Sequence, residues 1–229
     1  MGAYFFDLDG TLTDSAPGLL NSFGVALDFL GVRNVSEPSL RGHLGEPLPE
    51  VFRSYLPDIS NVDIESGIAA FRRSYDDEGI YVNKLYPGIE ALLKRLRELD
   101  FGAWVVTSKP VHHAEKVCEL LEIRDYFQGI IGAGLDEADT KSTLVHKALG
   151  LSEADPRSTI FLGDRCYDVV GALSNNVRPV GALWGYGSRT ELETAGCVEF
   201  AQSPSAFLAD YVESRVHGGF SAAALLAHS

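Results

Sequence analysis

Short, continuously apolar runs separated by helical patterns dominate the second half of the chain. Each run is typical of a strand that is buried on both faces. Helical segments of suitable length lie between the runs, and this alternation predicts an α/β fold with a doubly wound, Rossmann-like parallel sheet. The expected strands are a first one ending near Phe6 and four more at 102–107, 129–133, 159–163 and 179–183.

Residues 14–84 have a different pattern, with helical spacing throughout. Leu20, Phe23, Leu27 and Leu30 fall on one helix face, and the remainder of this segment reads as shorter helices. We therefore expect an all-helical cap domain at 14–84, inserted into a catalytic core formed by 1–13 and 85–229. The Ala-rich stretch 218–229 is compatible with a docked helix or a loose tail.

Composition narrows the range of partners. The 229 residues are 45% hydrophobic, enough for a sizeable core. With 19 basic and 32 acidic residues the net charge is -13, which argues against binding nucleic acid or an anionic membrane through bulk electrostatics. No signal peptide is recognisable, and no apolar run approaches the ~20 residues of a membrane helix. Three widely spaced cysteines favour a reducing, cytoplasmic setting.

Two carboxylates follow the first apolar run, in the segment Phe6-Asp7-Leu8-Asp9-Gly10. Side chains two residues apart share one face of a strand, so Asp7 and Asp9 are expected to point at one spot, with Gly10 permitting the turn that follows. Like charges this close repel unless a cation or a shared proton lies between them. A divalent metal and a phosphate ester would use such a pair, one acid as nucleophile and the other as proton carrier.

Two further candidates lie at later strand ends. Thr107 and Ser108 follow an apolar strand directly before a helix, where hydroxyls and free amides bind anions but also serve as ordinary helix caps. Lys141 opens the helix after the third strand. The helix dipole disfavours a cation at that end, which favours a role for Lys141 beside an anion or nearby carboxylates.

The last candidate is the strand end Gly163-Asp164, with Asp168 four residues later. Helical spacing would place Asp164 and Asp168 on one side, facing the edge of the sheet. Hard oxygen ligands without cysteine or histidine suit Mg²⁺ far better than zinc. Helix capping by Asp164 would explain one of the two aspartates but not both.

Taken in order, these motifs resemble those of the haloacid dehalogenase superfamily, specifically its phosphatases with a helical cap after the first motif. The cap and the segment from Trp184 to Ser188 are similar to the phosphoglycolate phosphatase-like branch, which includes 5′-nucleotidases. Ser108 departs from the asparagine of many phosphoglycolate phosphatases, so the substrate stays open. The expected substrate is a small phosphorylated metabolite, handled by a monomer or a homodimer.

The resemblance implies a role for each residue. Asp7 would be the nucleophile that forms an aspartyl-phosphate, and Asp9 the acid and then the base. Mg²⁺ would be held by Asp7, the backbone carbonyl of Asp9, Asp164 and Asp168, while Thr107, Ser108 and Lys141 would bind phosphate. In the cap, Arg41 and His43 are the candidates for recognising the leaving group, whereas His112, His113 and His146 are interpreted as structural.

Several alternatives lie on the same scaffold. Asp9 argues against halide removal, and phosphonate cleavage would need a cap lysine, whereas the first lysine of the chain is Lys84. A sugar-phosphate mutase stays open, because it uses the same carboxylate pair. Outside enzymes, an inactive binding protein or a signalling receiver is possible, but a receiver lacks the helical insert and an inactive scaffold would be expected to have lost one of these residues.

Overall fold

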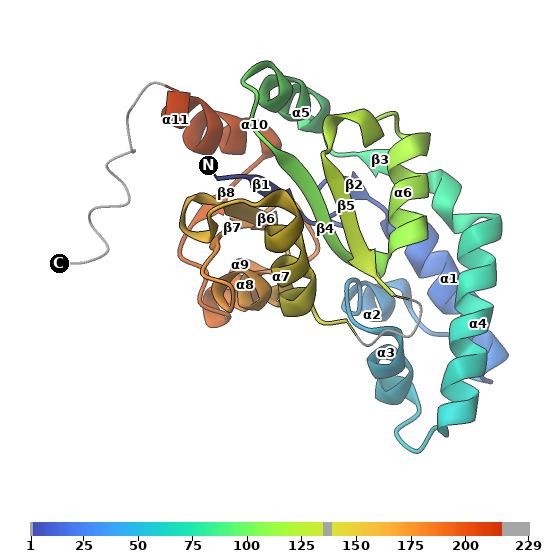
Figure 1. Ribbon diagram of the computed structural model, residues 1–229. Helices are drawn as coiled ribbons and strands as arrows, with labels where there is room; N and C mark the ends of the chain where they lie inside the picture. The colour runs from blue at the N-terminus through green and yellow to red at the C-terminus, as the bar shows by residue number, and fades with distance from the viewer. Residues whose placement is uncertain (1, 135–138, 217–229) are drawn as a thin grey trace.

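A computed structural model describes residues 2–134 and 139–216 of the chain. Its centre is a parallel sheet in the order β5-β4-β1-β6-β7-β8 (Figure 1). The predicted parallel, doubly wound sheet is therefore confirmed. The strands are β1 (Tyr4–Phe6), β4 (Ala103–Pro110), β5 (Gly129–Ala133), β6 (Ile160–Gly163), β7 (Arg178–Ala182) and β8 (Phe200–Ala201).

Helices cover both faces of the sheet. Successive side chains of β1 alternate between two buried clusters: Tyr4 and Phe6 belong to one and Phe5 to the other. The first cluster includes apolar residues of α5 (Ile89–Glu98), α6 (Val111–Leu120) and α10 (Pro204–Phe207), and the second those of α7 (Lys141–Ser152) and α8 (Cys166–Leu173). Burial on both sides explains why these strands are continuously apolar.

Between β2 (Thr13–Asp14) and β3 (Lys84–Leu85), which pair antiparallel, the chain forms helices only. We call residues 14–84 the helical segment. In Figure 1 it extends from the sheet as the blue-to-cyan part of the ribbon. Its ends coincide with the β2–β3 pair, but its status as a separate domain stays a prediction. Its helices are α1 (Ala16–Phe29), α2 (Glu37–Arg41), α3 (Leu48–Tyr55), α4 (Asn61–Asp77) and the 3₁₀ helix η1 (Gly79–Val82).

Several details differ from the expectation. Strand β4 runs on to Pro110, so Ser108 and Lys109 belong to the strand, and the following helix begins at Val111. The short edge strand β8 was not predicted, because two residues leave no detectable periodicity. The remaining elements are η2 (Arg124–Tyr126), η3 (Pro156–Ser158), α9 (Arg189–Thr194), η4 (Leu208–Glu213) and α11 (Ser214–Val216).

Among the described helices, none combines the length and the apolar character that crossing a membrane requires. Cys118, Cys166 and Cys197 are all free thiols. The interpretation of the C-terminal stretch 218–229 lies outside the described residues.

Candidate active site

Asp7 lies directly after β1, at the carboxyl edge of the sheet. Its backbone N–H donates to the Leu162 carbonyl (3.0 Å), which holds it between two strand ends. The residue is only 7% exposed, and its Oδ1 lies 2.7 Å from the Lys141 ammonium. Lys141 itself begins α7, so the helix start places a buried cation against the first predicted acid.

Asp164 follows β6 and is completely buried. Its Oδ1 accepts a hydrogen bond from the Thr11 hydroxyl and its Oδ2 one from the Tyr186 N–H, both at 2.8 Å. The Trp184 indole also donates to the Thr11 carbonyl (2.9 Å). The segment after β7 therefore orients Asp164, and this gives the Trp184–Ser188 motif a local role.

Asp168 occupies the first turn of α8. Its Oδ2 accepts from the N–H groups of Asp164 (3.1 Å) and Arg165 (3.0 Å), which turns the carboxylate back toward the sheet. The Lys141 ammonium lies 2.8 Å from Asp168 Oδ1, although this ion pair is not aligned as a hydrogen bond. Lys141 thus bridges Asp7 and Asp168.

Asp7, Asp164 and Asp168 form one buried acidic cluster, with ligand oxygens within 4.8 Å of one another. Burial raises the pKa of Asp7 to about 6 and that of Asp164 to about 8, with neighbouring carboxylates adding to both shifts. Lys141 alone does not balance three acids. An all-carboxylate donor set with excess negative charge fits a hard divalent cation such as Mg²⁺.

Asp9 has a different environment, and a residue that the sequence reasoning missed creates it. The Lys109 ammonium lies 3.1 and 2.9 Å from the two carboxylate oxygens of Asp9, and 4.4 Å from the centre of the Tyr75 ring. Lys109 is 8% exposed. The carboxylate of Asp9 is therefore not part of the acidic cluster. Its predicted contribution to metal binding would fall to the backbone carbonyl.

The two predicted hydroxyls, those of Thr107 and Ser108, directly precede Lys109 in β4. Thr107 is buried, and its Oγ1 accepts from the Lys109 N–H at 3.3 Å, whereas Ser108 is exposed. Both line a cavity of about 550 Å³ together with Asp7, Asp9, Lys109, Lys141 and Asp168. The structure thus brings all the core candidates except Asp164 to one cavity. Their role in binding phosphate stays a prediction.

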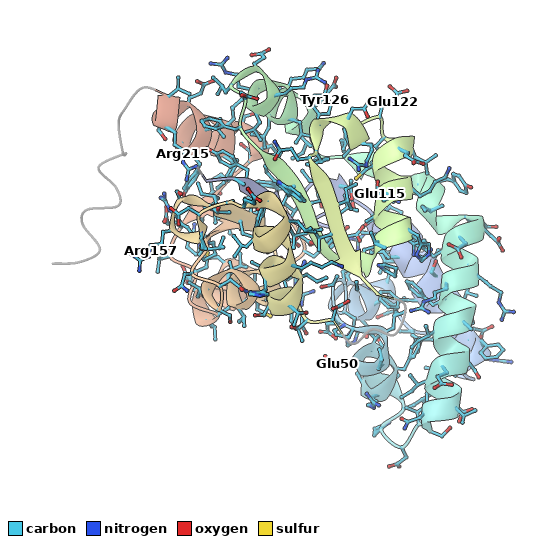
Figure 2. All side chains as sticks on the ribbon, in the orientation of Figure 1. Glu50, Glu115, Glu122, Tyr126, Arg157 and Arg215 are labelled. Carbon is cyan, nitrogen blue, oxygen red and sulfur yellow. The ribbon has the colours of Figure 1, made fainter. Side chains whose placement is uncertain are left out.

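The helical segment forms the opposite wall of this cavity. Figure 2 labels Glu50 of α3, one of the residues on that wall. The others include Leu19, Phe23, Leu48, Arg53, Phe71, Arg72 and Tyr75. Apolar and aromatic groups therefore face the acidic edge of the sheet, with two arginines among them.

The two cap candidates lie elsewhere. Arg41 is exposed and pairs with Glu37 at 2.9 Å, and His43 Nδ1 lies 2.7 Å from Glu46 Oε2. Neither residue lines the cavity, whereas Arg53 and Arg72 do. The turn-rich segment 40–45 favoured Arg41 and His43 in the sequence, but which arginines line the cavity depends on how the helices pack, which the sequence does not show.

Comparison with known proteins addresses the family directly. The sequence pattern of the haloacid dehalogenase-like hydrolases matches residues 4–182, well over half of the chain. The chain belongs to this family. The match covers β1 to β7 and so includes every residue of the acidic cluster.

Individual relatives carry several names. The chain is 36% identical over 184 residues to the tyrosine-protein kinase PtkA of Mycobacterium tuberculosis, covering 80% of this chain but only 62% of that protein. It is 31% identical to a 5′-nucleotidase of Pseudomonas aeruginosa, covering 92% of each. Other relatives, at 26–27% identity, are named phosphoglycolate phosphatase. The expected similarity to phosphoglycolate phosphatases and 5′-nucleotidases is thus confirmed.

A solved structure agrees with this assignment. A predicted phosphatase from Clostridium acetobutylicum superposes with a TM-score of 0.87 at 34% identity, covering 93% of this chain and 98% of that one.

Proposed function

We propose that this protein is a Mg²⁺-dependent phosphatase that hydrolyses a small phosphate monoester through an aspartyl-phosphate intermediate. The observation that carries the proposal is the separation of the two motif aspartates. Asp7 lies in the acidic cluster beside Lys141, while Asp9 lies beside Lys109 at the same cavity. The environment of Asp7 suits a nucleophile, and that of Asp9 suits a proton carrier.

The acidic cluster provides the metal ligands of the proposal. Asp7, Asp164 and Asp168 would hold Mg²⁺, with the Asp9 carbonyl as a further ligand. The bound ion would offset the negative charge of the phosphoryl oxygens and of the attacking carboxylate. With all four carboxylates ionised against the ammoniums of Lys109 and Lys141, the site has an excess of two negative charges, which one divalent cation balances.

The chemical steps use residues of this chain. A carboxylate oxygen of Asp7 attacks phosphorus, the bond from phosphorus to the ester oxygen breaks, and Asp9 gives its proton to the leaving oxygen. Asp9 then takes a proton from the water that attacks phosphorus and releases phosphate from Asp7. Thr107, Ser108 and Lys141 would bind phosphoryl oxygens, since phosphoryl transfer depends mainly on positioning and electrostatics.

The substrate is proposed in two forms. Phosphoglycolate is the first candidate, in line with the branch that the sequence resembles. The cavity supports a second. Its volume of about 550 Å³ and the aromatic rings of Phe23, Phe71 and Tyr75 leave room for a larger, planar leaving group, as in a nucleoside 5′-monophosphate. The helical segment would exclude water from this space as a cap.

The proposal is tested by phosphate release from a panel that includes phosphoglycolate, nucleoside monophosphates and a hexose phosphate, with Mg²⁺. Asp7→Asn should abolish turnover and keep the fold, whereas Asp28→Asn, an exposed aspartate on α1, should match the wild type. Hydrolysis by Asp7→Asn would reassign the nucleophile. Isomerised hexose phosphate, or phosphate moved onto a protein tyrosine without release, would replace the hydrolase assignment.

A further inference from the structure

A second group of potential metal ligands lies outside the acidic cluster, where the helical segment meets the core. Asp76 lies near the end of α4, and His112 and His113 are in the first turn of α6. One ligand atom from each lies within 4.8 Å of the others. Figure 1 shows α4 passing beside α6, so the group connects two parts of the chain that are far apart in sequence.

The side chains of Asp76, His113 and His112 are in contact one after another. His113 Nε2 lies 2.5 Å from Asp76 Oδ1. The His112 ring then lies 4.0 Å from the His113 ring, centre to centre and tilted by 45°. Within the described residues no hydrogen bond to the His112 side chain is present. A neutral imidazole has one nitrogen with a free lone pair, so each ring can offer one ligand atom to a metal.

The surroundings of His113 hold its ring in place. The residue is 5% exposed, and four groups face it: Asp76 and Tyr75 from α4, His112 from its own helix and the Lys109 ammonium from β4. Asp76 supplies a negative charge beside the imidazole.

We propose that Asp76, His112 and His113 form a second metal site, which binds a divalent transition ion such as Zn²⁺ and ties α4 to α6. Two imidazoles and one carboxylate are the donor set of open three-ligand zinc sites. Ligand atoms about 3.4 Å apart are needed for tetrahedral bonds of ~2.1 Å. Asp76 and His112 are exposed, so rotation of their side chains closes the remaining distance, and water completes the shell.

The site differs from the acidic cluster in its chemistry. The cluster offers only carboxylate oxygens and suits Mg²⁺, whereas imidazole nitrogens select borderline transition ions. The two groups are close to each other, because His113 also lines the cavity. Its ring contacts that of Tyr75, and the Lys109 ammonium lies over the Tyr75 ring. A metal here would restrain the helical segment behind Asp9. The inference does not rest on the proposed phosphatase activity.

Co²⁺ is the probe for the test, because imidazole and carboxylate ligands give it visible absorption bands. The full chain is titrated with Co²⁺ without Mg²⁺, and stoichiometry is measured by calorimetry. We expect two sites. Asp164→Asn should remove one of them. His112→Gln or Asp76→Asn should weaken the other by about tenfold or more, at least the loss seen when a ligand's outer-shell partner is removed. In the wild type, Zn²⁺ added over saturating Mg²⁺ should raise the melting temperature.

Matched controls lie in the same chain. Asp77→Asn makes the same charge change next to Asp76, and His146→Gln alters an exposed histidine on α7. Both should keep two Co²⁺ sites. Neither His112 nor Asp76 is buried, so folding is not at risk in their variants. The proposal is overturned if His112→Gln and Asp76→Asn bind as many Co²⁺ ions as tightly as the wild type does, or if the control variants lose the same site equally.

Discussion

Two aspartates only two residues apart are bound to different lysines in this protein. Asp7 contacts Lys141 at 2.7 Å, and Asp9 contacts Lys109 at 2.9 Å. Strand alternation predicted that both would point at one spot, but β1 ends at Phe6 and the chain turns before Asp9. Both acids still line the cavity. The sequence could therefore bring both acids to one cavity, but could not show which cation each of them faces.

Lys109 is expected to position Asp9 and to tune its proton transfer. Lys109→Met removes the ammonium and keeps most of the apolar volume, so turnover should fall by about 10²-fold, the lower range for loss of general acid–base catalysis. The loss should be greater for an alkyl phosphate than for an aryl phosphate, because an aryl oxide leaves without protonation. Steady-state rates on both substrates measure this.

The control for this variant is Lys116→Met, on the exposed side of α6, which should behave as the wild type. Equal losses on alkyl and aryl phosphates in Lys109→Met would show that Lys109 does not act through Asp9.

At the scale of elements, each strand end of the site depends on the turn that follows it. β4 extends to Pro110 with an irregularity in its pairing to β5 between Thr107 and Pro110, and within this stretch the Lys109 ammonium reaches Asp9. The sequence shows Thr-Ser-Lys-Pro plainly, but proline suggested that a helix would begin there. The presence of the five longer strands and the opening of α7 by Lys141 were predictable from the alternation of apolar runs and helical segments, because burial on both faces leaves a strong pattern. The order of the strands in the sheet and the end of β4 were not.

The turn after β1 requires a glycine at position 10, and this can be tested by substitution. Its φ is 88°, and a Cβ there would lie 2.4 Å from Asp164 Oδ2. Gly10→Ala should lower the free energy of unfolding by about 1–3 kcal/mol, through left-handed strain and displacement of Asp164. It should also weaken Mg²⁺ binding. Urea unfolding and Mg²⁺ titration measure the two effects.

Gly24 provides the matched control. It lies within α1, and a Cβ there would meet nothing within 4 Å. Gly24→Ala should therefore be neutral or stabilising by about 0.5–1 kcal/mol. The interpretation of the β1 turn is wrong if Gly10→Ala unfolds at the same urea concentration as Gly24→Ala.

At the scale of the whole molecule, the fold concentrates uncompensated charge at one edge of the sheet. The net charge of -13 is spread over the chain, but the buried excess belongs to the acidic cluster. Composition alone could not show this, because it does not distinguish a solvated carboxylate from a buried one. The order and spacing of the motifs could predict this edge, since parallel strands bring their carboxyl ends together. The wall of the cavity that the helical segment forms could not be predicted from the sequence, because it depends on how this segment packs.

The buried charge also makes stability depend on pH in a direction opposite to that of most carboxylates. Burial raises the pKa of Asp164 to about 8 in the folded state, whereas an unfolded aspartate titrates near 4. The folded protein therefore holds a proton that the unfolded chain releases. The resulting stability is fully present below the unfolded pKa and is lost as pH rises through the folded pKa, by up to about 1.4 kcal/mol per pH unit.

Without divalent metal, the free energy of unfolding should accordingly fall between pH 6.5 and 8. Mg²⁺ should reverse this trend, because it stabilises the ionised cluster and binds more tightly as the protons leave. Urea unfolding at both pH values, in EDTA and in Mg²⁺, measures the effect. Asp164→Asn should flatten the EDTA curve, since its amide does not titrate. A metal-free wild type that becomes more stable over this interval would mean that Asp164 is already ionised, and that the cluster is balanced without a divalent ion.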